Sequence, residues 1–251
     1  MGRTLSALAL GAATLAAAVL VDAGPAYAAT EQLRLDFDAT PTGQVEPGPW
    51  TSGCFADVAT PGDSGCIAVN APGSISRAAR SSGTSSSPAL AFPAAGSAVV
   101  EVPHAANLNP GTQDFTISAM VKLSSAQVTV GANLMQKGYY TEGASSQWKL
   151  QVDNGMPGCR IAGYLANGDW GFAKADSDIS IADKGWTFVQ CKRRGGVLSI
   201  TVGANPAVTA DQNAALDVSN TAKVTVGAKG AGLSNNDQFR GELDNAVLSV
   251  G

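Results

Sequence analysis

A strict alternation of apolar and polar side chains constrains the fold of this chain most. Residues 115–123 read FTISAMVKL, with an apolar residue at every second position from Phe115 to Leu123. Successive side chains of a β-strand point to opposite faces, so this pattern predicts a strand with one face buried in a core. A helix would need its apolar residues three and four apart, and the chain shows no convincing amphipathic helix.

Shorter strand-like runs, separated by turn residues, recur along the chain. They comprise residues 33–38, 89–92, 98–102, 148–152, 186–192, 197–202, 224–226 and 243–250. A spacing of roughly 8 to 15 residues between strands is typical of a β-sandwich and predicts an all-β fold. Charged residues make up only 14% of the chain, which argues against helical bundles and coiled coils. The net charge of −4 argues against a nucleic-acid partner, because binding phosphates needs a basic surface.

Residues 1–28 have the features of a secretory signal peptide. A positively charged start precedes an apolar run at 5–21, and residues 26–28 form a small-x-small signal peptidase motif. The apolar run could instead anchor the chain in a membrane, but the helix-breaking pair at 24–25 and the cleavage motif favour removal. We therefore expect a secreted chain of residues 29–251 without membrane attachment.

The chain has four cysteines, and an even number in an exported protein indicates disulfides. Cys54 and Cys66 are close in sequence and lie between turn residues, whereas Cys159 and Cys191 each lie in a strand-like run. Of the three connectivities we therefore predict Cys54–Cys66 and Cys159–Cys191. A zinc site is the weaker alternative, because there is no CxxC pair and the single histidine, His104, is far from every cysteine.

Residues 73–88 are rich in Ser, Ala and Gly and interrupt the series of strands. The segment could be a linker or a long surface loop. We predict a surface loop within one domain spanning residues 29–251, because the part of the chain before it has too few apolar residues to bury its own core.

A characteristic series of segments begins at residue 108. It comprises LNPG at 108–111, the strand at 115–122, LMQKG at 134–138, WKLQV at 148–152, KGWTFV at 184–189 and GELDNAV at 241–247. In this order the segments resemble the laminin G-like domains of secreted bacterial proteins, within the concanavalin A-like lectin/glucanase superfamily. The resemblance covers about residues 89–250, and residues 33–38 would supply the first strand. It implies a two-sheet antiparallel jelly-roll sandwich.

The superfamily includes glycan-binding modules, adhesive domains, glycoside hydrolases and polysaccharide lyases, so fold does not settle function. Glu242 and Asp244 match the first two acids of the ExDxxE signature of the glucanases, but Val247 stands where the third acid would be. The paired Arg, Gln-x-His and Tyr-rich motifs of lyase-like members are not visible. GDSG at 62–65 is reminiscent of a trypsin-like nucleophile motif, but His104 follows it instead of preceding it. We therefore favour a non-catalytic protein.

The resemblance also implies a role for Asp244 in binding structural calcium. Asp244 would share its side of the strand with Ala246 and Leu248 and would point toward the interior, where a carboxylate needs a strong partner. In superfamily members with structural calcium, an aspartate on a late strand can act together with residues near the first strand. Asp36 or Asp38 would be that companion, together with backbone carbonyls. The alternative is an Asp244 that accepts backbone hydrogen bonds or faces solvent.

Sugar rings stack on exposed aromatic side chains, and polar neighbours bind their hydroxyl groups. Candidate rings lie in the turn-like segment 167–171 and in the Gly- and Ser-rich loop at 138–147. The predicted ligand-binding residues are Trp170, Asp169, Asn167, Tyr139, Tyr140 and Gln136. We expect the core to contain Phe37, Phe115, Trp148, Trp186 and Phe188. The alternative is that the candidate rings only cap an edge of the sandwich.

Lys192, Arg193 and Arg194 form the one basic cluster, which we interpret as a solvated hairpin tip. Its alternative role would be contact with an acidic glycan. Taken together, the sequence predicts a secreted, non-catalytic module that binds an extracellular glycan or another extracellular ligand. The alternatives are a polysaccharide hydrolase or lyase, which needs converging acids, and a structural adhesion module, which needs an exposed apolar patch for a protein partner.

Overall fold

The computed structural model describes residues 29–82, 85–141 and 145–251. The predicted signal peptide, residues 1–28, lies outside these ranges. The described residues form sixteen strands and two short 3₁₀ helices, η1 (Ala106–Leu108) and η2 (Ser125–Gln127). None of the helices in the described ranges has the length and hydrophobicity needed to span a bilayer.

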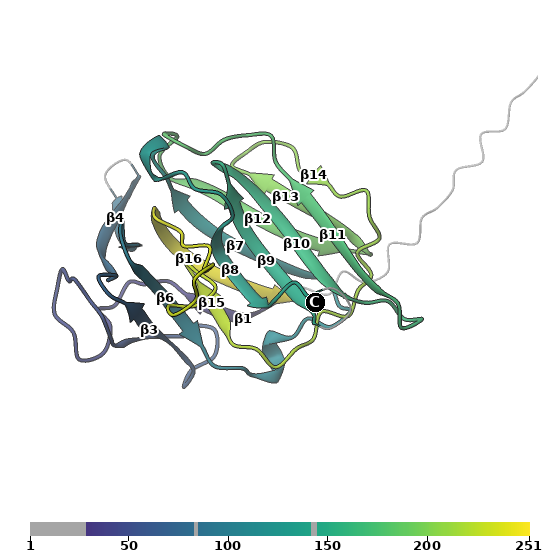
Figure 1. The fold of residues 1–251 in the computed structure, drawn as a ribbon, viewed down its shortest axis with the longest axis horizontal. Helices are drawn as coiled ribbons and strands as arrows, with labels where there is room; N and C mark the ends of the chain where they lie inside the picture. The colour runs from purple at the N-terminus through teal and green to yellow at the C-terminus, as the bar shows by residue number, and fades with distance from the viewer. Residues whose placement is uncertain (1–28, 83–84, 142–144) are drawn as a thin grey trace, which may run out of the picture.

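The strands form two eight-stranded antiparallel sheets. Sheet I contains, in spatial order, β14 (Val208–Thr209), β13 (Val197–Val202), β12 (Thr187–Arg194), β7 (Phe115–Lys122), β16 (Glu242–Val250), β5 (Ser85–Ala91) and β4 (Ser76–Ser82), with β1 (Thr30–Leu35) also paired to β16. Sheet II contains β11 (Trp170–Asp176), β10 (Met156–Tyr164), β9 (Gln147–Asp153), β8 (Ala132–Gly138), β15 (Val224–Val226), β6 (Ser97–Val102), β3 (Ser64–Asn70) and β2 (Cys54–Ala56). The sheets overlap in the view of Figure 1. The predicted two-sheet antiparallel sandwich is confirmed.

Strand β7 has the alternation that the sequence predicts. Phe115 and Ile117 point into the core, whereas the residues between them are partly exposed. Trp148 and Leu150 of β9 belong to the same core, which is shared by the two sheets. Burial of these apolar side chains against each other provides the main driving force for joining the sheets.

The expected core aromatics are placed correctly with two exceptions. Phe37, Phe115 and Trp148 are buried, as predicted. Trp186 is only half-buried, and Phe188 is 38% exposed. The prediction for Phe188 is wrong because β12 turns its other set of side chains inward, with Val189 and Cys191 in the core, and Phe188 therefore faces outward.

Both predicted disulfides are confirmed. Cys54 and Cys66 are paired neighbours on β2 and β3 at the edge of sheet II. Cys159 of β10 and Cys191 of β12 join sheet II to sheet I across the core. The second bond therefore links the two layers of the sandwich covalently.

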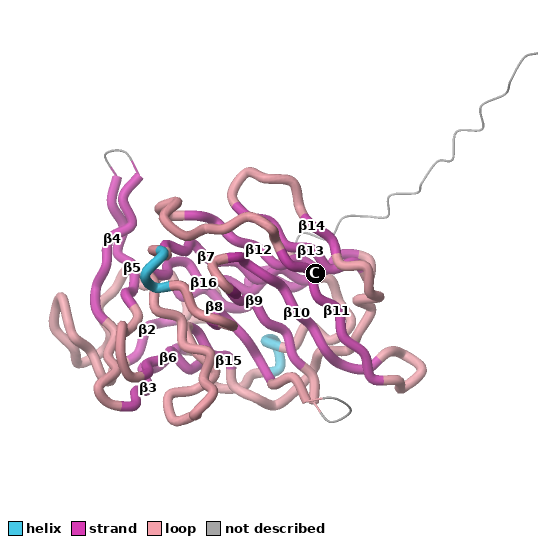
Figure 2. Tube along the Cα trace, turned by 45° about the horizontal axis from the view of Figure 1, so that its top comes forward, coloured by secondary structure: helices cyan, strands magenta, loops and turns pink. Residues whose placement is uncertain are grey.

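The Ser- and Gly-rich segment 73–88 is not a surface loop or a linker. Residues 76–82 form β4 and residues 85–91 form β5, and the two strands pair along their whole described length. Figure 2 shows this hairpin extending beyond the rest of the sandwich. The sequence did not predict this hairpin, because small and polar residues occupy both of its faces and apolar and polar residues do not alternate.

Candidate functional site

The outer face of sheet II carries a row of charged side chains. Trp148 and Leu150 of β9 lie in the core, so Lys149 between them points to the outer face. Strand pairing places Arg160 of β10 beside Lys149, and Lys174 of β11 beside Arg160. Directly paired residues of antiparallel strands share a face, so all three cations lie on the outer side.

Three aromatic side chains gather on the same face. Trp170 and Phe172 lie at even spacing from Lys174 on β11, and Tyr140 follows the end of β8. The ring centroids are 5.4 Å apart for Tyr140 and Trp170, 6.0 Å for Tyr140 and Phe172, and 6.2 Å for Trp170 and Phe172. Tyr140 is 42% exposed and Phe172 43% exposed. We call Tyr140, Trp170 and Phe172 the aromatic cluster.

Hydrogen bonds fix the neighbourhood of the aromatic cluster. The indole N–H of Trp170 donates to the carbonyl of Ser145 at 3.2 Å, which ties β11 to the segment that precedes β9. The hydroxyl of Tyr139 donates to the carbonyl of Lys229 at 3.5 Å. The structure thus brings together two of the aromatic residues that the sequence proposed for ligand binding, Tyr140 and Trp170. Tyr139 is bonded to Lys229 instead, and no ring contact between described residues joins it to the cluster.

Asn167 and Asp169 lie in the exposed turn that leads into Trp170. The side-chain amide of Asn167 donates to Asp169 Oδ2 at 2.8 Å, and Asn167 Oδ1 accepts the backbone N–H of Asp169 at 3.1 Å. These bonds shape the turn and leave both side chains open to solvent. The two residues are therefore placed where they could contact a ligand beside the cluster.

Gln136 is placed differently from the other candidates. It pairs with Lys149 and so lies on the outer face, but it is buried. Its Oε1 accepts a hydrogen bond from Asn133 at 2.7 Å, and its Nε2 donates to the carbonyl of Gly138 at 3.2 Å. The side-chain amide of Gln136 is therefore hydrogen-bonded within β8 and is not exposed to a ligand.

The charges next to the aromatic cluster centre on Asp237. Its Oδ2 lies 3.0 Å from Lys149 Nζ and 2.9 Å from Lys229 Nζ. The guanidinium of Arg160 lies over the ring of Tyr140, 5.2 Å from its centroid. Burial lowers the pKa of Lys149 to about 8, although Asp237 opposes this shift. Lys149 therefore keeps a charge at neutral pH in a poorly hydrated position.

Sequence reasoning missed Phe172, Arg160 and Asp237 as parts of this site. Phe172 could have been found, because it follows Trp170 by two residues and must share its strand face. The position of Arg160 depends on the pairing of β10 with β11, which the sequence does not encode locally. Asp237 lies in a loop with a left-handed φ of 49°, and no motif marks it.

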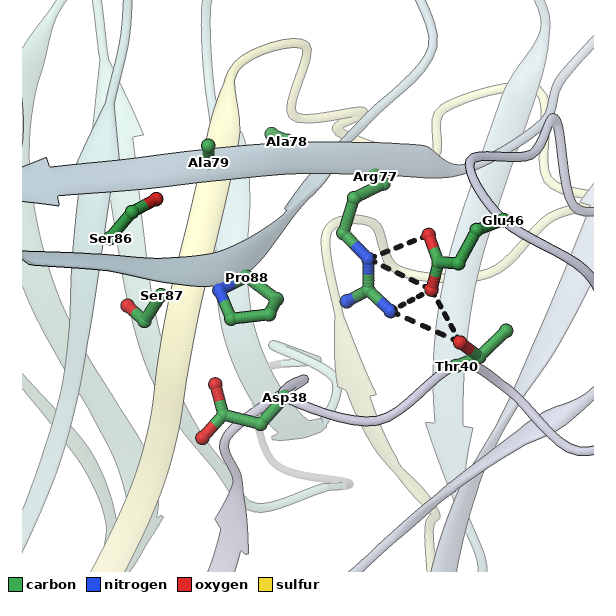
Figure 3. Close-up of a pocket in the computed structure, with 9 residues that line it drawn as sticks. All are labelled: Asp38, Thr40, Glu46, Arg77, Ala78, Ala79, Ser86, Ser87 and Pro88. Atoms are coloured by element: carbon green, nitrogen blue, oxygen red, sulfur yellow. Dashed lines mark hydrogen bonds and ion pairs between the residues drawn. The ribbon is translucent and has the colours of Figure 1, made fainter.

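Apart from the aromatic cluster, the structure has a recess of about 400 Å³ at the β4–β5 hairpin (Figure 3). Arg77 dominates it: its guanidinium forms an ion pair with Glu46, donates to the carbonyl of Phe37 at 2.6 Å and lies 5.1 Å from the ring centroid of Trp50. The other polar groups of its lining come from Asp38, Thr40, Ser86 and Ser87. Among the described residues that line this recess none is aromatic, and its cation, Arg77, is already paired with Glu46.

A β-bulge changes the expected orientation of Asp244. Between Asp244 and Val247 the pairing with β7 shifts by one residue, and Asn245 adopts a left-handed φ of 51°. Asp244 therefore lies on the outer face of sheet I, together with Glu242. The expectation that it shares its side with Ala246 and points into the sandwich is wrong because of this extra residue.

Both acids of the partial glucanase signature are paired with cations. Glu242 lies 3.0 Å from Lys122 Nζ. Asp244 is 1% exposed, and its Oδ2 accepts a hydrogen bond from Arg80 Nε at 2.5 Å. Each carboxyl group is held by its own basic residue, which differs from the converging acid and base of a hydrolase.

Two of the three residues proposed for calcium, Asp244 and Asp36, already accept hydrogen bonds from protein donors. Asp244 Oδ1 accepts the backbone N–H of Asn245 at 2.8 Å, and Asp36 Oδ1 accepts the backbone N–H of Asp38 at 3.2 Å. Burial raises the pKa of Asp244, Arg80 lowers it, and the nearby charge of Asp38 raises it, so these groups are within electrostatic reach. In the described ranges no three His, Cys, Asp or Glu side chains are grouped to hold a metal. Calcium at Asp244 would compete with Arg80 for this carboxylate.

The basic cluster at 192–194 is not a uniformly solvated hairpin tip. Arg194 is exposed, but Arg193 is buried. Strand β12 extends through Arg194, so the hairpin turn begins at residue 195 and the predicted tip residues 192–194 belong to the strand. Alternation along the strand turns Arg193 inward, where its guanidinium binds backbone carbonyls.

Residues 94–249 match the Laminin_G_3 family model, which is described as the concanavalin A-like lectin/glucanases superfamily. This match covers more than half of the chain. The chain belongs to the concanavalin A-like lectin/glucanases superfamily. The laminin G-like resemblance of the sequence is thereby confirmed. No curated protein sequence matches the chain.

Several solved structures share this superfamily fold. Domain 4 of AbnA, a GH43 extracellular arabinanase from Geobacillus stearothermophilus solved with arabinotriose, has a TM-score of 0.57 and 16% identity, over 89% of this chain and 93% of that one. The binding domain of Paraclostridial Mosquitocidal Protein 1 has a TM-score of 0.51 and 15% identity, over 78% of this chain and 46% of that one. The Botulinum neurotoxin serotype G binding domain has a TM-score of 0.50 and 10% identity, over 87% and 47%. The chain therefore spans about half the length of the two toxin domains, and the likeness establishes a shared fold.

Proposed function

We propose that this protein is a secreted, non-catalytic module that binds carbohydrate through the aromatic cluster. The observation that carries the proposal is the grouping of Tyr140, Trp170 and Phe172 as partly exposed rings on the outer face of sheet II. Aromatic faces pack against the apolar C–H faces of sugar rings, and adjacent polar side chains bind the hydroxyl groups. Asn167 and Asp169 supply such polar groups next to Trp170.

A structural neighbour, the disulfides and two ion pairs support the proposal. Domain 4 of AbnA has a comparable length and was solved with arabinotriose. The two disulfides are typical of an oxidising, extracytoplasmic compartment and support secretion. The ion pairs of Glu242 and Asp244 support a protein without a hydrolytic acid pair.

The proposal is tested by calorimetric titration of the purified protein with arabinan, xylan, β-glucan, chitin and pectin fragments. We expect at least one glycan to bind, and Trp170→Ala to weaken it about tenfold or more, which is ~1.4 kcal/mol. Phe188→Ala is the control, because Phe188 is an exposed aromatic ring on the other sheet, sheet I. It should change affinity less than about twofold.

Three results would contradict the proposal. No glycan binds, the Trp170→Ala variant binds as well as the wild type, or the protein releases reducing sugars or unsaturated products from a bound glycan. The third result would favour the hydrolase or lyase alternative. An absence of glycan binding combined with specific capture of a purified matrix protein would favour the adhesion alternative.

Structural calcium at Asp244, with Asp36 or Asp38 as companion, is a separate proposal. Because Arg80 pairs with this carboxylate, calcium would compete with it. Thermal melting in millimolar calcium tests this exchange, and an unchanged midpoint rules it out.

A further inference from the structure

The side chains around the aromatic cluster carry an excess of positive charge. Lys149 and Lys229 share the single carboxylate of Asp237. Burial lowers the pKa of Lys149 most, and the nearby charges of Lys229 and Arg160 lower it further, so Arg160 lies within electrostatic reach of this group. These four groups hold three positive charges against one negative charge, and the exposed Asp169 beside Trp170 adds a second negative charge, so an excess of one positive charge remains among the described residues. The excess stands out on a chain whose net charge is −4.

The cation beside Arg160 on the neighbouring strand is neutralised. Lys174 Nζ lies 2.6 Å from Asp176 Oδ2 on the same strand, β11. It therefore adds no net charge to the surface beside Arg160. The unbalanced charge is confined to the part of the face that adjoins Tyr140.

Arg160 is the cation best placed to meet a ligand. Its guanidinium is held over Tyr140, and among the described residues no hydrogen bond or ion pair engages it. Its Nε is buried and has no hydrogen-bond partner among the described residues. A guanidinium presents its donors as a planar fork that matches the two oxygens of a carboxylate or a sulfate. Contact with such a group would satisfy donors that the described residues leave without partners.

We propose that the saccharide bound at the aromatic cluster is acidic, with a carboxylate or sulfate group that pairs with Arg160. This inference rests on the proposed function and adds the charge of the ligand to it. The sugar ring packs on Trp170 and Phe172, and the acidic group lies toward Arg160 and the Lys149–Asp237–Lys229 group. The pairing offsets the local positive charge, so affinity falls as salt concentration rises.

The test compares charged probes with matched neutral probes in calorimetric titrations. The first pair is trigalacturonate and its methyl ester, and the second is dextran sulfate and dextran, so the two pairs separate carboxylate from sulfate recognition. We expect the charged member of at least one pair to bind ten times or more tighter than its neutral counterpart. Raising NaCl from 50 to 500 mM should remove most of that difference, as expected for charge pairing.

Arg160→Gln should abolish the preference for the charged probe, which is measured in the same variant as the ratio of its affinities for the charged and the neutral member of a pair. Arg160→Lys keeps the charge but loses the fork, and it should retain part of the preference. Lys174→Gln is the matched control, because it removes a neighbouring cation that Asp176 already neutralises, and it should change the preference less than twofold. Melting midpoints of all three variants establish that each is folded.

The two proposals fail in different ways. Binding of neutral glycans with no preference within either pair, or a preference that survives Arg160→Gln, overturns the acidic ligand and leaves carbohydrate binding intact. Absence of binding to every glycan, charged or neutral, overturns the proposed function itself.

Discussion

Arg193 is buried at the end of β12, with only 1% of its surface exposed. Its Nε donates to the carbonyl of Gln113 at 3.0 Å, and its terminal nitrogens donate to the carbonyls of Gly111 and Leu216, each at 2.6 Å. The guanidinium also lies 4.8 Å from the ring centroid of Phe115. Arg193 thereby ties the segment before β7 and the segment at 214–216 to the edge of sheet I.

Replacing Arg193 should destabilise the protein much more than replacing its neighbour. Arg193→Gln leaves buried carbonyls without donors, and we expect a loss of about 2 to 4 kcal/mol in the free energy of unfolding. Arg194→Gln changes an exposed side chain and should cost less than about 0.5 kcal/mol. Urea unfolding of both variants measures the difference. Equal stabilities would contradict the structural role of Arg193.

Lys137 is a second fully buried cation. Its Nζ donates to Asn109 Oδ1 at 2.8 Å and to Asn220 Oδ1 at 3.1 Å. Burial lowers the pKa of Lys137 to about 8, from an ordinary value of 10.5. The folded protein therefore releases this proton at a lower pH than the unfolded chain does.

The lowered pKa of Lys137 predicts the sign of a pH effect on stability. Between about pH 8 and pH 10.5 the unfolded chain binds more protons at this site, so the contribution of Lys137 to the free energy of unfolding rises with pH. Lys137→Met should remove this contribution and make the rise across that window smaller than in the wild type. Unfolding at a series of pH values tests the prediction, and a steeper rise in the variant would refute it.

The strands differ in how far their sequences predict them. β7 and β9 were predictable, because apolar residues occupy every second position of each strand and point into the core. In β9 the polar residues between them are buried as well. In β12 the adjacent Phe188 and Val189 are both apolar, so the phase of the strand was ambiguous and Phe188 was assigned to the wrong face. Such a choice is settled by packing against the other sheet, which no local pattern contains.

The β4–β5 hairpin depends on contacts that are distant in sequence. Arg77 pairs with Glu46, and Arg80 pairs with Asp244, 164 residues away. These ion pairs anchor a hairpin of small and polar residues to two other parts of the fold. The bulge at Asn245, which presents Asp244 to Arg80, is equally invisible in the sequence.

The disulfides act on different elements and should differ in their contribution to stability. Cys54–Cys66 closes a span of 12 residues between adjacent strands, whereas Cys159–Cys191 closes 32 residues and joins the two sheets. Loop entropy predicts losses of about 3 and about 4 kcal/mol when the respective pairs are replaced by alanine. Thermal melting of the two double variants compares them. A larger loss for the Cys54–Cys66 pair would contradict the ranking.

The whole molecule places the candidate site on one face of the sandwich. Trp170 and Tyr140 come from different strands and loops, yet the folded chain brings their rings to 5.4 Å. The sequence predicted these residues from their turn-rich surroundings. The register of β9, β10 and β11 adds Arg160 and Lys149, which the sequence alone could not place beside them. Phe172 follows from its position two residues after Trp170 on β11.

The central claim is that a glycan packs against the aromatic cluster, and the four tryptophans of the chain provide a direct measurement of it. Trp50 and Trp148 are buried, Trp186 adjoins sheet I, and Trp170 lies in the cluster. The ¹⁵N–¹H spectrum resolves their indole N–H groups during titration with the glycan that binds most tightly. The account predicts a saturable shift of the Trp170 indole signal with the other three nearly unchanged. A saturable shift at Trp186, with Trp170 unmoved, would contradict it.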